Sequence, residues 1–258
     1  GELSSKDHSG FETTGGATLS FNNVNFDSLT YAYSNTTGGV GENISWLMEG
    51  AIAHSESSAG NLNFDTVGFT KNNVSLTAER LSADVDMQIQ GGLVNNNSTS
   101  EIKNSNFSAN NVTSTAQSNG FTSIYDHSLN AEILGGAVYN SNQMSISDTI
   151  FNKTNATADV QDDANRVTSA TATVLGGALY NSGSDLTLSG ATKFTNNTAT
   201  ATGHGDASLT LTAQGGALYN SGTATITGIT FDGNSAAANA TGDELTTVNL
   251  TAQGGAIY

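Results

Sequence analysis

Paired carboxylates are the side chains of this 258-residue chain whose spacing comes closest to catalytic chemistry. Asp84 and Asp86 lie two residues apart, and Asp162 and Asp163 are adjacent within the segment QDDANR. A glycoside hydrolase needs two carboxyl groups that converge on one groove. Because side chains alternate along a strand, Asp84 and Asp86 would share one face, whereas QDDANR is typical of an exposed loop. Both pairs are therefore interpreted as solvated carboxylates.

A polysaccharide lyase would need an arginine or a lysine as its base, often beside calcium. The arginines of the chain are Arg80 and Arg166. Arg80 lies in TAERLSADVD with Asp84 and Asp86 close by, which is the most lyase-like grouping in the sequence. A polysaccharide-acting lyase or hydrolase therefore stays open as the alternative, and we favour a protein without enzymatic activity.

The sequence predicts no cofactor and no dedicated metal site. Calcium loops of the EF-hand and nonapeptide-repeat types are absent, although the acidic segment 158–166 could bind calcium weakly. The four histidines show no mutual spacing that would indicate a zinc site: His8, His54, His127 and His204.

Four aromatic residues of the first half of the chain fit neither of the repeated motifs described below: Tyr31, Tyr33, Trp46 and Tyr125. Exposed aromatic side chains often anchor binding surfaces, so these four are candidate contact residues. The same side chains could instead cover one end of a repetitive fold. Thr-x-Thr runs such as 198–202 resemble the arrays of solenoid ice-binding proteins, but repeats of unequal length favour structural threonine ladders.

Acidic residues dominate the charge, with 23 against 7 basic residues and a net charge of -16. Nucleic acids and anionic membranes attract clustered Lys and Arg, so neither is an expected partner. No run approaches the roughly 18 apolar residues that span a bilayer, and the first ten residues lack a signal-peptide pattern. We therefore expect any signal or anchor to lie outside this segment. The absence of cysteine excludes a disulfide framework and thiol catalysis.

Two short motifs recur about every forty residues. The first is GGA followed by Val, Leu or Ile, with a worn copy, EGAIA, at 49–53. Its clearest copies contain Gly136-Ala137, Gly177-Ala178, Gly216-Ala217 and Gly255-Ala256. The second is F-x-x-N, whose intact copies are Phe69 with Asn72, Phe107 with Asn110, Phe194 with Asn197 and Phe231 with Asn234. Two interleaved motifs in register indicate a solenoid rather than a sandwich or a barrel.

Between the motifs, polar and apolar residues alternate, as in MSISDTIF (144–151) and TATITGITF (223–231). This period of two predicts half-buried strands, and no window carries a helical stripe. Six strands of about five residues fit in one repeat, so we predict two coils per repeat in a right-handed, single-stranded parallel β-helix. The residues expected to be buried include Ala137, Ala178, Ala217, Phe194 and Phe231.

One continuous solenoid is expected, with 1–14 as a lead-in or cap, 15–134 as degenerate repeats and 135–258 as regular repeats. The sequence stops at 254–258, within a repeat, so its last coil would leave backbone groups and core side chains uncovered. We therefore expect a tendency to homotypic, end-to-end association, opposed by the net charge and promoted by salt.

The combination of GGA-[ILV] with F-x-x-N resembles the passenger domains of polymorphic outer-membrane proteins, and more broadly it is similar to autotransporter adhesins. The resemblance covers the chain from Gly15 to Tyr258. Chlamydial members usually carry cysteine, and this chain has none. The resemblance implies a non-enzymatic adhesin or self-association module, exported across the bacterial outer membrane. It also implies display at the cell surface, with protein or glycan partners on host or neighbouring cells.

Overall fold

The computed structural model describes residues 2–7, 10–14, 16–36, 42–56, 60–80, 83–120, 126–164, 167–205, 208–242 and 247–258. Within these ranges the chain forms β-strands and no α-helix, as the alternation of polar and apolar residues predicts. The strands make five parallel sheets, which we call sheets A to E in the order in which the chain visits them. The predicted parallel β-helix is confirmed.

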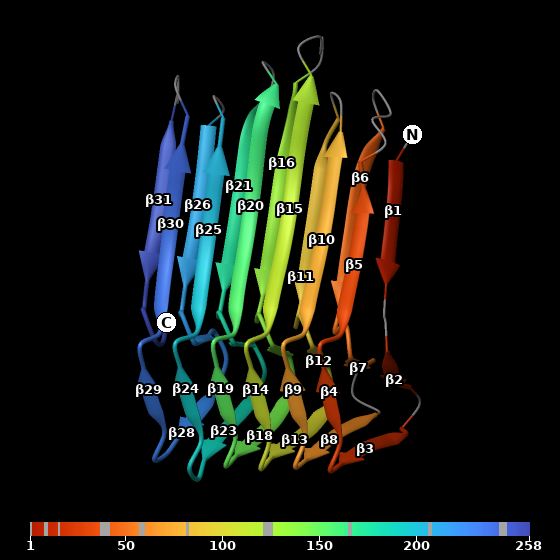
Figure 1. Ribbon diagram of the computed structural model, residues 1–258, viewed down its shortest axis with the longest axis vertical. Helices are drawn as coiled ribbons and strands as arrows, with labels where there is room; N and C mark the ends of the chain where they lie inside the picture. Colours follow the sequence, from red (N-terminus) through yellow and green to blue (C-terminus); the bar gives the residue numbers. More distant parts are fainter. Residues whose placement is uncertain are drawn as a thin grey trace.

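Sheets A and E contain the long strands. Sheet A consists of β1 (Glu2–Asp7), β6 (Asn43–Glu49), β11 (Val85–Gln90), β16 (His127–Leu134), β21 (Val167–Leu175), β26 (Ser208–Gln214) and β31 (Val248–Gln253). Sheet E consists of β5 (Thr30–Asn35), β10 (Asn73–Arg80), β15 (Asn111–Gly120), β20 (Asn155–Ala164), β25 (Thr198–His204) and β30 (Ser235–Thr241). The strands of these two sheets make up the upper half of Figure 1, where the two sheets overlap in the view.

Sheets B, C and D contain shorter strands and close the lower half of the solenoid (Figure 1). Sheet B consists of β2 (Phe11–Thr13), β7 (Ala53–Ser55), β12 (Val94–Asn96), β17 (Val138–Asn140), β22 (Leu179–Asn181) and β27 (Leu218–Asn220). Sheet C consists of β3 (Thr18–Asn22), β8 (Asn61–Asp65), β13 (Thr99–Lys103), β18 (Gln143–Ser147), β23 (Asp185–Ser189) and β28 (Ala224–Ile226). Sheet D consists of β4 (Asn25–Asp27), β9 (Gly68–Thr70), β14 (Asn106–Ser108), β19 (Ile150–Asn152), β24 (Lys193–Thr195) and β29 (Thr230–Asp232).

Each repeat makes one turn of the solenoid, so the prediction of two coils per repeat is wrong. Each of the strands β1 to β26 pairs with the strand five positions later in the chain, and Phe107, for example, lies beside Phe151 of the next turn. The prediction assumed strands of about five residues, but β15 and β20 have 10 residues each. Five strands and their corners therefore use the whole repeat. We call each such turn a rung.

Strands β1 and β2 belong to the same parallel sheets as the strands of the later rungs. β1 pairs with β6 in sheet A, and β2 pairs with β7 in sheet B. The N-terminal and C-terminal ends of the chain lie at opposite ends of the stack (Figure 1). Like residues of successive repeats therefore form columns that run along the solenoid axis.

A column of phenylalanines fills the core beneath sheet D. Neighbouring rings stack with centroids 4.4 to 5.3 Å apart through Phe26, Phe69, Phe107, Phe151, Phe194 and Phe231. Phe194 is fully buried, as predicted. Phe231 is only half-buried, and the prediction for it is wrong, because it lies in the last rung and no further ring stacks on it.

The asparagine of each F-x-x-N motif joins two rungs at the corner between sheets D and E. The Asn110 side chain donates to the carbonyl oxygen of Phe69 at 2.8 Å and accepts from the Asn72 backbone at 3.0 Å. Asn197 likewise donates to the Phe151 carbonyl at 3.0 Å. These side chains satisfy backbone groups that the corner removes from the sheet ladder.

The GGA motif forms the corner between sheets A and B. Gly176 adopts a φ of +76°, which favours glycine. The next glycine, Gly177, packs against the backbone of Gly216 and Thr198 so closely that a Cβ would not fit. Behind this corner Ala137, Ala178 and Ala217 are fully buried, as predicted, whereas Ala256 of the last rung is half-buried.

Candidate contact surface

The structure places three of the predicted contact residues at the N-terminal end of the solenoid, on columns that face the core. Tyr31 and Tyr33 of β5 lie beside the buried Val74 and Leu76 of β10. Trp46 of β6 stacks on Tyr33 with ring centroids 3.7 Å apart, and all three aromatic side chains are partly buried against the core. This position suits the end-covering role, and a contact role for them stays a prediction. Tyr125 lies outside the described residues.

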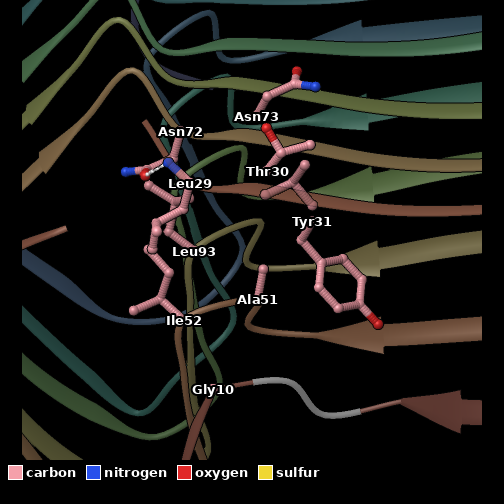
Figure 2. Close-up of a pocket in the computed structure, with 10 residues that line it drawn as sticks. Gly10, Leu29, Thr30, Tyr31, Ala51, Ile52, Asn72, Asn73 and Leu93 are labelled. Carbon is pink, nitrogen blue, oxygen red and sulfur yellow. Dashed lines mark hydrogen bonds between the residues drawn. The ribbon is translucent and has the colours of Figure 1, made fainter. Parts of the chain in front are cut away.

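An apolar pocket of about 220 Å³ opens beside Tyr31 (Figure 2). Its lining comes from the first three rungs and consists of Gly10, Leu29, Thr30, Tyr31, Ala51, Ile52, Asn72, Asn73, Val74 and Leu93. The Asn72 side chain accepts a hydrogen bond of 3.0 Å from the Leu29 backbone at one wall. The lining contains no carboxylate, histidine or lysine, so this pocket offers no general acid or base of those types.

The lyase-like grouping around Arg80 is not assembled. Arg80 ends β10 with its side chain buried inside the solenoid. Asp84, just before β11, and Asp86, on β11, instead face outward. Asp84 accepts hydrogen bonds from the backbone and hydroxyl of Ser128 at 2.8 and 3.0 Å, and Asp86 accepts one from Asn130 at 2.7 Å. These two carboxylates therefore bind the next rung of the sheet and do not converge with Arg80.

The interpretation of QDDANR as an exposed loop is wrong for Asp162. β20 extends through this residue to Ala164, and the Asp162 side chain is buried, while Asp159 faces outward on the same strand. The predicted calcium segment thus divides its carboxylates between opposite faces of a strand. The side chain of Asp163 and all of Arg166 lie outside the described residues.

A column of tyrosines is the most regular aromatic feature of the outer surface. Tyr139, Tyr180 and Tyr219 occupy the central position of successive strands in sheet B, between side chains that face inward, and Tyr258 continues the column. Neighbouring ring centroids are 5.2, 5.2 and 5.4 Å apart, and the rings are nearly parallel. We call these four residues the tyrosine column.

The tyrosine side chains lie on the outer side of sheet B, because the residues before and after Tyr139 and Tyr180 face inward. Its centroid spacing slightly exceeds the separation of hydrogen-bonded strands, about 4.8 Å, so the ring faces are turned toward one another along the solenoid axis. Each phenol group can donate and accept a hydrogen bond. The column therefore forms a rigid row of polar groups on an apolar base.

Burial and neighbouring acids change the electrostatics of the column. Burial raises the pKa of Tyr139, and Tyr180, Glu49 and Glu132 raise it further, while a hydrogen bond with the Ser182 side chain lowers it. Burial is also the main cause that raises the pKa of Tyr219. The hydroxyl groups of Tyr139 and Tyr219 thus stay protonated, and so able to donate, in neutral solution.

Sequence reasoning missed the tyrosine column as a contact candidate. Its signal is the dipeptide Tyr-Asn that directly follows GGA-x in three repeats, at Tyr139, Tyr180 and Tyr219. The asparagines of the same dipeptides face inward and bond to each other from rung to rung, with Asn140 donating to Asn181 at 2.6 Å and Asn181 to Asn220 at 2.7 Å. This inner ladder fixes the register of the tyrosines outside it.

The N-terminal part of the same column carries Asn95, His54 and Glu12 in place of tyrosine. Glu12, His54 and Glu56 are the one group of three side chains, within the described ranges, whose ligand atoms come close enough to hold a metal ion. No zinc-ligand spacing involving His54 can be recognised in the sequence, because Glu12 precedes it by a full repeat and only the rung register brings the two side chains together.

No protein-family description, curated protein or solved structure matches this chain. Among the described residues, no helix could span a bilayer.

Proposed function

We propose that this chain is a non-enzymatic contact module, a β-helical segment of a cell-surface adhesin that binds partner molecules through the outer face of sheet B. The observation that carries the proposal is the tyrosine column. Tyrosine anchors contribute a large share of binding energy at many interfaces, because they combine apolar area with a hydrogen-bonding group.

The solenoid supports such a role through its rigidity. Each tyrosine is held by stacking on its neighbours and by the inner asparagine ladder, so little side-chain entropy is lost when a partner binds. Identical groups repeat about every 5 Å along the column, which suits an extended partner that makes the same contact several times. Protein segments and glycan chains on host or neighbouring cells are partners of this kind.

Surface display and export across a bacterial outer membrane complete the proposal. They rest on the resemblance of the GGA-[ILV] and F-x-x-N repeats to passenger domains of autotransporter adhesins. The predominance of acidic residues supports this setting, because strong like charge keeps a long exposed rod soluble.

Adhesion of coated beads tests the proposal. Fluorescent beads carrying the chain are counted on cultured epithelial cells and, in a second arm, on beads carrying the same chain. We expect adhesion in at least one arm and a fall of about tenfold for the double variant Tyr180→Ser, Tyr219→Ser. The matched control, Thr187→Ala with Thr225→Ala, changes one outward pair of sheet C and should retain adhesion. Equal adhesion of the tyrosine variant and the wild-type chain would refute the proposal.

Enzymatic activity would also overturn it. Purified chain is incubated with neutral and acidic polysaccharides, and reducing ends and the ultraviolet absorbance of unsaturated products are followed. We expect neither signal to rise above that of a heat-denatured sample. A rise that Arg80→Ala abolishes would instead support the polysaccharide lyase that the sequence left open.

A further inference from the structure

Three side chains from the first two rungs meet at the N-terminal end of sheet B. Glu12 on β2 and His54 on β7 are direct partners in neighbouring rungs, and Glu56 follows His54 by two residues. One carboxylate oxygen from each glutamate and one ring nitrogen of His54 all lie within 4.8 Å of one another. The register of the solenoid, rather than any local motif, produces this grouping.

The backbone beneath the three side chains is fixed by hydrogen bonds between the rungs. The Phe11 backbone donates to the Ile52 carbonyl at 2.8 Å, and the Glu56 backbone donates to the Thr13 carbonyl at 3.1 Å. His54 is 1% exposed, whereas Glu12 and Glu56 are exposed. The imidazole is therefore held in place by packing, whereas the two carboxylates reach solvent.

We propose that Glu12, His54 and Glu56 form a binding site for a divalent transition-metal ion of the Zn²⁺ type. Imidazole and carboxylate are both ligands of such ions, and three protein ligands leave the fourth position to water. Bonds near 2.1 Å place the ligand atoms of a tetrahedral site about 3.4 Å apart. Small rotations of the exposed glutamates bring the three atoms from their present separation to that distance.

Charge favours a cation at this position. Two carboxylates held close together repel each other, and a divalent ion removes that repulsion while the imidazole contributes a neutral ligand. The overall charge of -16 raises the local concentration of cations around the chain. Ca²⁺ fits less well, because it takes six to eight oxygen ligands and does not favour imidazole.

Isothermal titration of the tag-free, chelator-treated chain with ZnCl₂ tests the site. We expect one Zn²⁺ per chain at saturation and a rise in the melting temperature on loading. Titration with CaCl₂ should give binding at least about tenfold weaker, because the histidine ligand selects against it. No saturable Zn²⁺ binding, or tighter binding of Ca²⁺, would overturn the proposal.

Variants locate the binding. Glu12→Gln and Glu56→Gln change exposed side chains and should keep the fold, yet each should weaken Zn²⁺ binding by about tenfold or more. Glu101→Gln removes the same charge from sheet C, where Glu101 pairs with Lys103 at 3.3 Å, and should bind Zn²⁺ like the wild-type chain. Wild-type affinity in both Glu12→Gln and Glu56→Gln would place the bound ion elsewhere and overturn the assignment.

Discussion

Thr154 occupies the position that asparagine holds in the intact F-x-x-N motifs. Its backbone N–H donates a hydrogen bond of 3.0 Å to the side-chain oxygen of Asn197 in the next rung. Its own hydroxyl oxygen is buried without a hydrogen-bond partner. The amide that would reach the Phe107 carbonyl of the preceding rung, as Asn110 reaches Phe69, is missing at this corner.

We therefore predict that Thr154→Asn stabilises the chain by about 1 kcal/mol, because it completes the hydrogen bonds of the corner. Urea unfolding followed by circular dichroism measures the change. Thr154→Val is the control: it removes only the unsatisfied hydroxyl and should gain less than Thr154→Asn. A loss of stability in Thr154→Asn would mean that the corner cannot accept the larger side chain.

Glu132 shows how the outer face of sheet A responds to pH. Burial raises its pKa, and the negative charge of Asp86 raises it further. The folded chain therefore holds this proton more tightly than the unfolded chain, so the contribution of Glu132 to stability is lost as pH rises through its folded pKa. Glu132→Gln should raise stability at pH 7, and the gain should vanish below the ordinary glutamate pKa of about 4.3. Thermal unfolding at several pH values measures this, with Glu101→Gln, an exposed ion-paired glutamate, as a control that should show no gain at pH 7.

Residue identity alone predicted part of the core but not the tyrosine column. The motif residues Ala178, Phe194 and Asn197 lie where the repeat placed them. The direction of Tyr31 could not be predicted, because it lies in a repeat whose GGA and F-x-x-N copies are worn. Arg80 follows an intact F-x-x-N copy, but a charged side chain on the core side of β10 was not expected. A shift of one residue along a strand exchanges the core side for the outer side.

Corners, rather than strands, determine the shape of each rung. The GGA corner was predictable because it uses glycine. The corners on either side of sheet D were not, since ordinary residues adopt positive φ there, for example Thr66 at +59° and Lys71 at +54°. The length of the strands in sheets A and E could not be predicted from the sequence either, because these strands continue through polar residues such as Gln161. For these two reasons, the sequence alone could not show that each repeat makes one turn of the solenoid.

The second glycine of the GGA corner provides a test with a matched control. A methyl group at Gly177 would meet the backbone of Gly216 and Thr198, so Gly177→Ala should cost about 3 kcal/mol or more. Gly255 has the same place in the motif, but in the last rung its nearest contact would be the Asn234 carbonyl oxygen at 3.3 Å. Gly255→Ala should therefore be tolerated. Chemical denaturation of both variants measures the difference, and equal costs would contradict the tight corner.

At the scale of the whole molecule, one solenoid turn per repeat places corresponding residues of successive repeats side by side on the surface. It stacks Tyr139, Tyr180 and Tyr219 in one column, and it brings Glu12 beside His54 at the N-terminal end of that column. With two coils per repeat, alternate coils would separate these residues. The proposed contact surface and the proposed metal site therefore both depend on the rung register.

Disulfide trapping measures that register most directly, because the chain contains no cysteine of its own. Thr173 and Thr212 are outward-facing partners in neighbouring rungs of sheet A. Two cysteines on adjacent strands lie within the Cα separation of about 4.4–6.8 Å that a disulfide needs. Thr173→Cys with Thr212→Cys should form an intramolecular disulfide under mild oxidation, detected by mass spectrometry. Thr173→Cys with Lys193→Cys, half a repeat apart in the sequence and on sheets A and D, should stay reduced. A disulfide in the second pair and none in the first would contradict one turn per repeat, and with it the column on which the proposed function rests.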